Sequence, residues 1–336
     1  MFKTIDLALQ GGGSHGAFTW GVLERLLEIE GLVIEGICGT SAGAMNATML
    51  AYGMHTGGRQ GAIELLERFW KRAADHGRFG GFRSSWLDNW LGKGRLDYSP
   101  VYRFFEFYSQ IFSPYQYNPL DYNPLKDLLN ELVDFEALRK STAIKLFICA
   151  TNVRTSRAKV FTNAEISADA VLASACLPQL FRAVEIDGEA YWDGGYMGNP
   201  PIFPLIDDTE TEDILLVQIN PIYSEKVPQT AIEIRDRVNE LSFNASLMHE
   251  MRRINFVQKN LDKGLKEHEK LRDLYIHMIS PDKSMGNLGV SSKYNTDWAF
   301  LQELREMGRR LAEQWVQDNY DKLGNESSCN LEEVFL

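Results

Sequence analysis

Cysteine is scarce in this sequence of 336 residues: there are four, and no two of them form a CxxC pair. A disulfide framework and a cysteine-based metal site are therefore not expected, and a chain of this length can bury enough surface without them. Apolar residues flank Cys38, Cys149 and Cys176, which predicts buried thiols in a reducing compartment.

Long hydrophobic runs and an excess of positive charge are also missing. The longest apolar run is far shorter than the ~20 residues of a membrane-spanning helix, so any membrane contact is expected to be peripheral. The first seven residues include Asp6 and lack the pattern of a signal peptide, and we expect a cytoplasmic protein. With 35 basic and 46 acidic side chains the net charge is −11, which argues against nucleic acid as a partner.

Predicted strands and helices alternate along the chain. A strand at 5–9 is followed by a glycine turn, a helix that ends near Gly31, and a second strand at 34–38. This order is typical of a parallel sheet. Further strands are predicted at 144–150, 159–161, 190–192, 214–219 and 274–279. The expected fold class is α/β, with a mostly parallel central sheet flanked by helices.

The first chemical motif is Gly39-Thr40-Ser41-Ala42-Gly43, which fits G-x-S-x-G between the second strand and a helix predicted at 43–52. A tight strand-to-helix turn needs glycine on both sides of the serine, and it lifts the hydroxyl clear of the sheet. The helix beyond it directs its first amides and its positive dipole end at the reaction centre. Ser41 is thus a candidate nucleophile, and the alternative is a serine N-cap in a glycine-rich turn.

The second motif is Gly11-Gly12-Gly13-Ser14-His15-Gly16, directly after the first strand. It also fits the dinucleotide-binding pattern G-x-G-x-x-G, but that pattern needs an acidic residue at the end of the second strand, where this chain has Gly39-Thr40-Ser41. A row of glycine amides could instead stabilise a developing negative charge beside the serine. A plain tight turn is the remaining alternative.

A serine needs a base to become nucleophilic. His249, in a helical run, and His277, in a strand-like segment, are candidates, but neither lies in a glycine-rich loop. Asp193 is better placed, because it ends a short aromatic strand and is followed by Gly194 and Gly195. An ordinary Asp-Gly turn is the alternative for this segment.

Together, GGGSHG at 11–16, GTSAG at 39–43 and DGG at 193–195 resemble the patatin-like phospholipase family, over about residues 4–206. The resemblance implies a three-layer fold and hydrolysis of acyl esters by a Ser–Asp dyad without histidine, metal or cofactor. Carried over, Ser41 is the nucleophile, Asp193 the general base, and the amides of Gly11, Gly12 and Gly13 form the oxyanion hole. Ser14, His15, Gly16, Gly39, Gly43, Gly194 and Gly195 complete the motifs.

One departure from the family is His15, since the family usually has Arg or Lys at this position. The resemblance therefore predicts backbone amides, rather than a fixed positive charge on this side chain, as the stabilising groups for an oxyanion. Burial of Asp193 by Tyr191 and Trp192 is expected to make its carboxylate a stronger base.

An aromatic-rich insert is expected at about 79–122. Between Phe79 and Tyr117 there are thirteen aromatic residues in thirty-nine, against 11% overall, and residues 68–103 carry a net charge of +5. Rings and basic side chains together suit an element that faces lipid, including Trp86 and Trp90. The alternative is that the rings form the core of a subdomain.

Residues 207–323 are expected to add strands and helices to the catalytic domain. Helical runs are predicted at 231–270 and 296–320, with the first packing on the main domain or, alternatively, forming a homodimer interface. The polar segment 324–336 is expected to be a flexible tail.

The sequence thus predicts a lipid acyl-ester hydrolase of the phospholipase A or lysophospholipase type. A non-catalytic lipid-binding module and a dinucleotide-binding oxidoreductase are the alternatives. Head-group, acyl-chain and positional selectivity depend on pocket shape, which residue patterns do not specify.

Overall fold

The computed structural model describes residues 2–80, 96, 99, 111–261, 272–281, 285 and 288–336. Most of the predicted aromatic insert, including Trp86 and Trp90, lies outside these residues, as do 262–270 of the predicted helical run. Within these ranges, every helix is too short or too polar to span a lipid bilayer.

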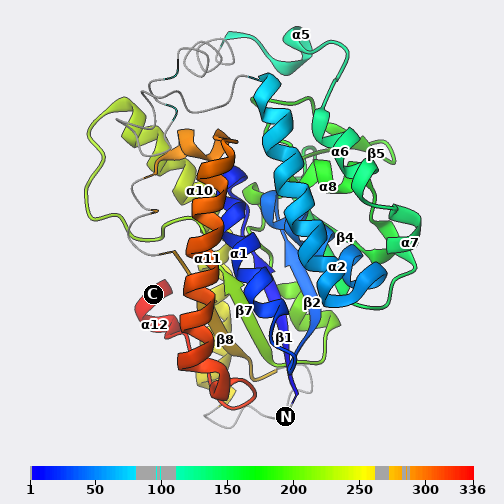
Figure 1. The fold of residues 1–336 in the computed structure, drawn as a ribbon. Coiled ribbons are helices and arrows are strands. Elements are labelled where there is room, and N and C mark those ends of the chain that lie inside the picture. Colours follow the sequence, from blue (N-terminus) through cyan, green and yellow to red (C-terminus); the bar gives the residue numbers. More distant parts are fainter. Residues whose placement is uncertain are drawn as a thin grey trace.

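An eight-stranded sheet forms the centre of the molecule and confirms the predicted α/β fold (Figure 1). The strand order is β5-β6-β3-β2-β1-β7-β8, and β4 pairs with the other edge of β3. The strands are β1 (Lys3–Leu9), β2 (Leu32–Gly39), β3 (Lys145–Asn152), β4 (Ala158–Thr162), β5 (Val184–Ile186), β6 (Glu189–Asp193), β7 (Asp213–Val217) and β8 (Tyr275–Ile279). Strands β3, β2, β1, β7 and β8 are parallel, so their carboxyl ends lie at one edge of the sheet.

Helices cover both faces of this sheet. They are α1 (Gly16–Leu27), α2 (Ala42–Gly80), α5 (Pro114–Tyr117), α6 (Pro124–Leu132), α7 (Phe135–Arg139), α8 (Ala168–Ser174), α9 (Phe203–Asp208), α10 (Ala231–Leu261), α11 (Trp298–Asn319) and α12 (Leu331–Phe335). Short 3-10 helices are η1 (Gly13–His15), η2 (Asn163–Glu165), η3 (Gly194–Tyr196), η5 (Val290–Tyr294) and η6 (Tyr320–Lys322). The helix predicted at 43–52 continues to Gly80 through a kink at Gly58, where φ is 63°.

The alternation of side chains along the strands produces two cores. Ile5, Leu7 and Leu9 of β1 pack with α1, α2 and α11, which lie in front of the sheet in Figure 1. Ala8, between them in the sequence, faces the opposite core with α9, α10 and α12. The sheet is therefore the middle layer of three.

The carboxyl-terminal segment differs from the flexible tail that its polarity predicts. Phe335 of α12 is fully buried, and the amide of Cys329 donates to the carbonyl oxygen of Ile276 at 3.0 Å. A few apolar residues spaced along a polar stretch are enough to hold this segment on the sheet.

The register around β3 brings two distant segments together. Ala150 pairs with both Lys159 of β4 and Asp193 of β6, and Ile148 pairs with both Phe161 of β4 and Gly39 of β2. Because β4 occupies one edge of β3 throughout, β2 and β6 must share the other edge. The ends of these two strands therefore meet head to head, with the chain after Gly39 facing the chain after Asp193.

Candidate active site

Ser41 lies in the tight turn between β2 and α2, and its φ of 55° is in the left-handed region that L side chains rarely adopt. Two hydrogen bonds hold this turn. The Ser41 amide donates to Oγ of Ser174, at the end of α8, at 2.9 Å. The Thr40 hydroxyl donates to the carbonyl oxygen of Gly198 at 2.6 Å. Ser41 is only 9% exposed, so its hydroxyl lies in a nearly closed site at the start of α2.

Asp193 is the last residue of β6, whose end meets the end of β2 along β3, and it is fully buried. Its Oδ1 accepts a hydrogen bond from the Gly195 amide at 2.7 Å. Its Oδ2 is buried and has no hydrogen-bond partner among the residues that the structure describes. The pKa of Asp193 is raised to about 7 by burial, and the Gly195 amide, the Ser41 hydroxyl and Lys293 partly offset this rise. The Ser41 hydroxyl thus lies close enough to lower the pKa of this carboxyl, although Oδ2 accepts no hydrogen bond from the described residues.

Phe243 of α10 closes the site over this carboxylate. Its ring lies so close to Gly195 that a Cβ there would come within 2.3 Å of it, and its centre lies 5.5 Å from that of the Tyr196 ring, with the two rings tilted by 58°. Tyr191, which was expected to shield Asp193, instead packs edge-on against Phe161 at 5.5 Å. Residues beyond the strand therefore contribute to the burial that raises the pKa of Asp193.

The glycine loop after β1 lies directly beside the serine turn. A Cβ on Gly11 would lie 2.6 Å from Cβ of Ser41, so only glycine allows this approach. The Gly11 amide donates to Oδ1 of Asn199 at 2.7 Å and is therefore not available to an oxyanion, contrary to our expectation. The amides of Gly12 and Gly13 have no acceptor in the described part of the chain, and Gly13 has a φ of 58°.

His15 is buried in η1 and carries no charge. Its Nε2 lies 2.7 Å from Oγ of Ser292, whose hydroxyl donates to the carbonyl oxygen of Gly289 at 2.8 Å. Nε2 of His15 is therefore the donor. Burial, helped by nearby Lys293, lowers the pKa of His15 to about 3. Position 15 thus supplies no positive charge to this site.

The other motif residues surround the same turn. Ser14 is buried in η1, and Gly16 starts α1 with its carbonyl oxygen accepting from Nδ2 of Asn46 at 2.9 Å. Gly39 ends β2, and the Gly43 amide donates to the carbonyl oxygen of Thr40 at 2.8 Å. Gly194 packs against the carbonyl of Cys149 in β3.

Several polar residues that no motif indicated complete the site. Asn199, besides accepting from Gly11, donates to the carbonyl oxygen of Phe243 at 3.2 Å. Asn220, after β7, donates to the carbonyl oxygen of Gly11 at 2.7 Å. The ammonium group of Lys293 in η5 donates to Oδ1 of Asn220 at 2.8 Å. The only sequence signal for two of them was position: Asn220 directly follows a predicted strand, and Asn199 follows the glycine turn after Asp193.

Neither candidate histidine base lies with Ser41. His249 is exposed on α10. His277 is buried in β8, where its Nε2 lies 2.9 Å from Oδ1 of Asp213, at the beginning of β7. Asp213 marks the amino-terminal edge of the sheet, opposite the Ser41 turn.

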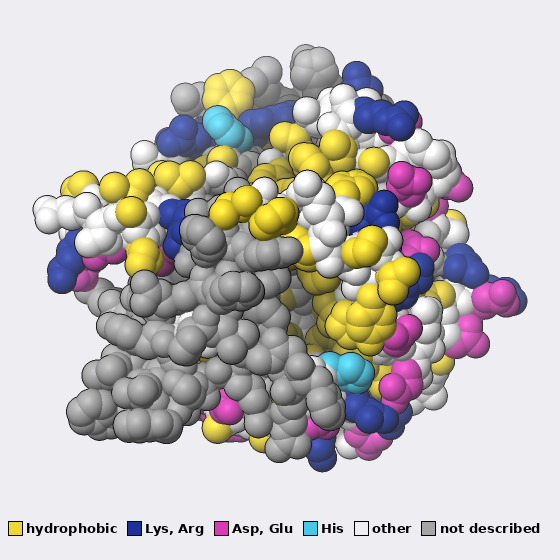
Figure 2. Space-filling view, turned by 90° about the horizontal axis from the view of Figure 1, so that it is seen from above, with side chains coloured by type: hydrophobic (Ala, Val, Ile, Leu, Met, Phe, Trp, Pro, Cys, Tyr) yellow, Lys and Arg dark blue, Asp and Glu magenta, His cyan; other side chains and the backbone are white. Residues whose placement is uncertain are grey.

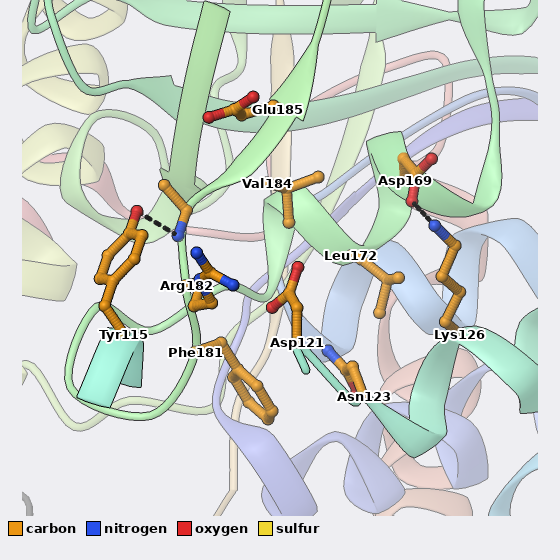
Figure 3. Close-up of a pocket in the computed structure, with 11 residues that line it drawn as sticks. Tyr115, Asp121, Asn123, Lys126, Asp169, Leu172, Phe181, Arg182, Val184 and Glu185 are labelled. Atoms are coloured by element: carbon orange, nitrogen blue, oxygen red, sulfur yellow. Dashed lines mark hydrogen bonds and ion pairs between the residues drawn. The ribbon is translucent and has the colours of Figure 1, made fainter. Parts of the chain in front are cut away.

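A cavity of about 340 Å³ lies beside α5, α6, α8 and β5 (Figure 3). Its lining is strongly polar, with the ion pair between Lys126 and Asp169 at 2.7 Å and with Asp121, Arg182 and Glu185. Neither Ser41 nor Asp193 lines it. Such a lining does not suit an acyl chain. Across the described ranges, no three His, Cys, Asp or Glu side chains gather closely enough to hold a metal ion.

Comparison with known proteins gives one family match. The family model described as "Patatin-like phospholipase" matches residues 7–206. Among solved structures, VipD from Legionella pneumophila is similar at 16% identity and a TM-score of 0.38, covering 99% of this chain and 72% of that one. The type III effector ExoU gives 14% identity and a TM-score of 0.36, covering 94% and 53%. The ExoU–SpcU complex of Pseudomonas aeruginosa gives 17% identity and a TM-score of 0.33, covering 96% of this chain and 61% of that one. Curated proteins give no match.

Proposed function

Because the chain belongs to the patatin-like phospholipase family, we propose that it hydrolyses lipid acyl esters with Ser41 as nucleophile and Asp193 as general base. The observation that carries the proposal is the buried Oδ2 of Asp193, which has no hydrogen-bond partner in the described chain although the Ser41 hydroxyl is close enough to lower the pKa of this carboxyl. Ser41 itself lies in a strained turn. Burying a polar atom without a hydrogen-bond partner costs free energy, so such an atom calls for an explanation such as a catalytic role. As a general base, Oδ2 of Asp193 can accept the proton of the Ser41 hydroxyl.

The first half of the reaction forms an acyl-enzyme. Oγ of Ser41 attacks the ester carbonyl carbon while its proton passes to Oδ2 of Asp193, and the carbonyl oxygen becomes an oxyanion. The amides of Gly12 and Gly13, which have no acceptor in the described chain, donate to this oxyanion, and the amino-terminal end of α2 adds its positive dipole. When the intermediate collapses, the bond to the alcohol oxygen breaks, and that oxygen takes the proton from Asp193.

The second half releases the fatty acid. A water molecule attacks the acyl carbon and gives a proton to Asp193, the same amides hold the second oxyanion, and the bond to Oγ breaks as Oγ takes the proton back. With a pKa of about 7, Asp193 is ionised in a large fraction of molecules at neutral pH and is a stronger base than an ordinary carboxylate. We therefore expect hydrolysis to increase with pH through a midpoint near 7.

The experiment is labelling with a fluorophosphonate, followed by peptide mass spectrometry and by hydrolysis assays on a chain-length series of nitrophenyl esters and defined phospholipids. We expect one adduct, on Ser41, and loss of both labelling and hydrolysis in Ser41→Ala. A wild-type protein that binds lipid vesicles but neither reacts nor hydrolyses any ester would favour the non-catalytic lipid-binding alternative. The dinucleotide alternative loses its basis, because the family model includes the Gly11–Gly16 motif.

The lipid-facing role of the insert remains part of this proposal. Its described residues expose Ile111, Tyr115, Leu120 and Tyr122, and the first turns of α10 expose Ile232, Ile234, Val238 and Leu241. Figure 2 shows hydrophobic side chains gathered across the described part of this end of the molecule. A water-insoluble substrate must be reached at a surface, and exposed rings and aliphatic side chains suit contact with it.

Co-sedimentation with phospholipid vesicles tests this contact. We expect the double variant Leu120→Asp, Tyr122→Asp to bind vesicles several-fold more weakly, because each charge opposes insertion. Phe256→Asp is the matched control, since Phe256 is 69% exposed but lies roughly 36 Å further along α10 than Ile232. Equal binding by the double variant and the wild type would argue that these side chains serve another purpose.

A further inference from the structure

Lys293 is the charged residue that the glycine loop packs against. It lies in η5, outside the segment that matches the family model. A Cβ on Gly13 would lie 2.4 Å from the Lys293 carbonyl oxygen, so the loop and η5 are in close backbone contact. The Lys293 ammonium group lies 5.8 Å from the centre of the Phe243 ring, which covers Gly195 next to Asp193. The side chain thus starts beside the glycine loop and reaches the ring that covers the segment after the proposed base.

A chain of hydrogen bonds connects this ammonium group to the loop. It donates to Oδ1 of Asn220 at 2.8 Å and to Oδ1 of Asn239 at 3.3 Å. Because Oδ1 of Asn220 is held in this way, Nδ2 is directed to the carbonyl oxygen of Gly11, at 2.7 Å. Gln10 supports the same asparagine, since its Oε1 accepts from the Asn220 amide at 2.9 Å. The position of the glycine turn therefore depends on Lys293.

The surroundings of Lys293 determine what its charge can do. His15 is neutral, and the three carboxylates that act on Lys293 are Glu240 and Asp236 of α10 and Asp193. Burial lowers the pKa of Lys293 to about 8, and Glu240, Asp236 and Asp193 oppose this shift. Cys149, Cys176 and Tyr196, which also face Asp193, have raised pKa values and are neutral near pH 7. Lys293 is thus the positive group acting on both His15 and Asp193 among the described residues.

We propose that Lys293 is the positioning residue of this active site, holding the Gly11–Gly13 turn through Asn220 and supplying the positive charge that His15 does not. The inference rests on the proposed function and deepens it. A positive charge beside the turn stabilises the anionic intermediate, and it favours the ionised form of Asp193. Because Lys293 does not touch the reacting atoms in this arrangement, it acts through the loop and through its field.

The dependence of kcat/KM on pH separates this role from a merely structural one. In the wild type we expect a rise through a pKa near 7, from Asp193, and a fall through a pKa near 8, where Lys293 loses its proton. In Lys293→Met the fall disappears and the rise moves to higher pH, because the charge that lowers the pKa of Asp193 is gone. The maximal kcat/KM decreases by about 10- to 100-fold.

Two further variants complete the experiment. Lys293→Arg keeps its charge at all accessible pH values, so the fall near pH 8 should disappear while most of the activity remains. Lys322→Met is the matched control, because Lys322 is also half-buried and donates to an asparagine Oδ1, that of Asn319, at 3.0 Å. Lys322 follows α11, whereas Lys293 precedes it. We expect Lys322→Met to keep the wild-type dependence of kcat/KM on pH.

A folded Lys293→Met protein with the wild-type profile and wild-type kcat/KM would overturn this inference and leave the proposed function intact. Hydrolysis that survives Ser41→Ala would overturn the proposed function, and this inference with it. If Lys293→Met does not fold, the rate at which a fluorophosphonate labels Ser41 in the wild type is followed from about pH 6 to 10. A decrease above about pH 8 supports the role of Lys293, and a constant rate overturns it.

Discussion

Two clusters in this molecule contain a serine and an aspartate, at opposite edges of the same sheet. One joins Ser41 and Asp193, after the carboxyl end of β2 and at the end of β6. The other joins Ser328, His277 and Asp213, with Oγ of Ser328 at 3.0 Å from Nδ1 of His277 and Nε2 of His277 at 2.9 Å from Asp213. By side-chain type, the second cluster is the more complete copy of a Ser-His-Asp triad.

The surroundings of the two clusters differ in what they leave unsatisfied. Both oxygens of Asp213 accept from the Gly324 amide, at 2.8 and 3.0 Å, and Oδ1 also accepts from His277. Nε1 of Trp315 donates to Oγ of Ser328 at 3.3 Å, and the Ser328 amide donates to Nδ1 of His277 at 3.3 Å. Each group in this cluster is used to fasten the segment around residues 324–328 to β7 and β8.

The Ser41 cluster has the opposite character. Among the described residues, one oxygen of Asp193 and the amides of Gly12 and Gly13 have no hydrogen-bond partner. Ser41 also has a backbone conformation that costs energy. Polar groups that stay unsatisfied in the resting protein can be satisfied by a transition state. The environment of a serine, more than the identity of its neighbours, therefore indicates whether it reacts.

The largest effect is expected when the charge of each aspartate is removed, because the two clusters should then respond differently. Asp193→Asn keeps the acceptor for the Gly195 amide but removes the base, so kcat/KM should decrease by at least about 10³-fold. Asp213→Asn should leave kcat/KM unchanged and lower the melting temperature, because it disturbs the bonds to His277 and Gly324. Ester hydrolysis and thermal unfolding of both variants provide the test. Near-wild-type turnover in Asp193→Asn would show that another group takes the Ser41 proton.

A smaller effect on activity is expected from the glycine loop. Gly13→Ala and Gly188→Ala both place alanine at a positive φ, 58° and 78°, and each loses about 1 kcal/mol of folding free energy for that reason. Only at Gly13 would the new Cβ also meet a neighbour, the Lys293 carbonyl oxygen at 2.4 Å, whereas Gly188 has open space. Displacing the Gly12 and Gly13 amides should reduce kcat/KM by about 10- to 100-fold. A folded Gly13→Ala protein as active as Gly188→Ala would exclude these amides as oxyanion donors.

The fold and the motifs could be predicted because their signals are local. Short apolar runs indicated seven of the eight strands. The short β5 was missed because Val184-Glu185-Ile186 has too few residues for a pattern. The position of β6, head to head with β2 on one edge of β3, had no such signal. Side-chain periodicity reports which face a strand presents and does not report which strand it pairs with.

The remainder of the candidate site could not be predicted for a similar reason. Asn220, Phe243 and Lys293 come from three segments beyond residue 206, and each is an ordinary residue in its own segment. Their roles depend on contacts with Gly11, Gly195 and Gly13, which only the packed chain creates. The amide of Gly11 was likewise assigned to an oxyanion because the sequence does not show that Asn199 occupies it.

The unusual pKa of Asp193 predicts a dependence of stability on pH that sharpens the contrast further. Its folded pKa of about 7 lies above the ordinary 3.8, so the ionised form is penalised by folding. This penalty begins as pH rises above about 4 and is complete above about 7. Asp193→Asn removes it, so the variant should exceed the wild type in stability at pH 8 by roughly 1–3 kcal/mol, and by much less near pH 4.5. Thermal unfolding at both pH values measures the difference, and an equal offset at the two would contradict the raised pKa.

The smallest effect is expected at the serine of the second cluster. Ser328→Ala removes one hydrogen-bonding hydroxyl from His277 and Trp315 but keeps the Ser328 amide bonded to Nδ1 of His277. We expect a loss of about 1 kcal/mol, or about 2 °C in melting temperature, with kcat/KM and fluorophosphonate labelling unchanged. If Ser328→Ala instead abolished hydrolysis while Ser41→Ala kept it, the reactive serine would lie at the edge where every group already has a partner. Ser328, and not Ser41, would then be the nucleophile, and polar groups without hydrogen-bond partners would no longer indicate the site of reaction in this molecule.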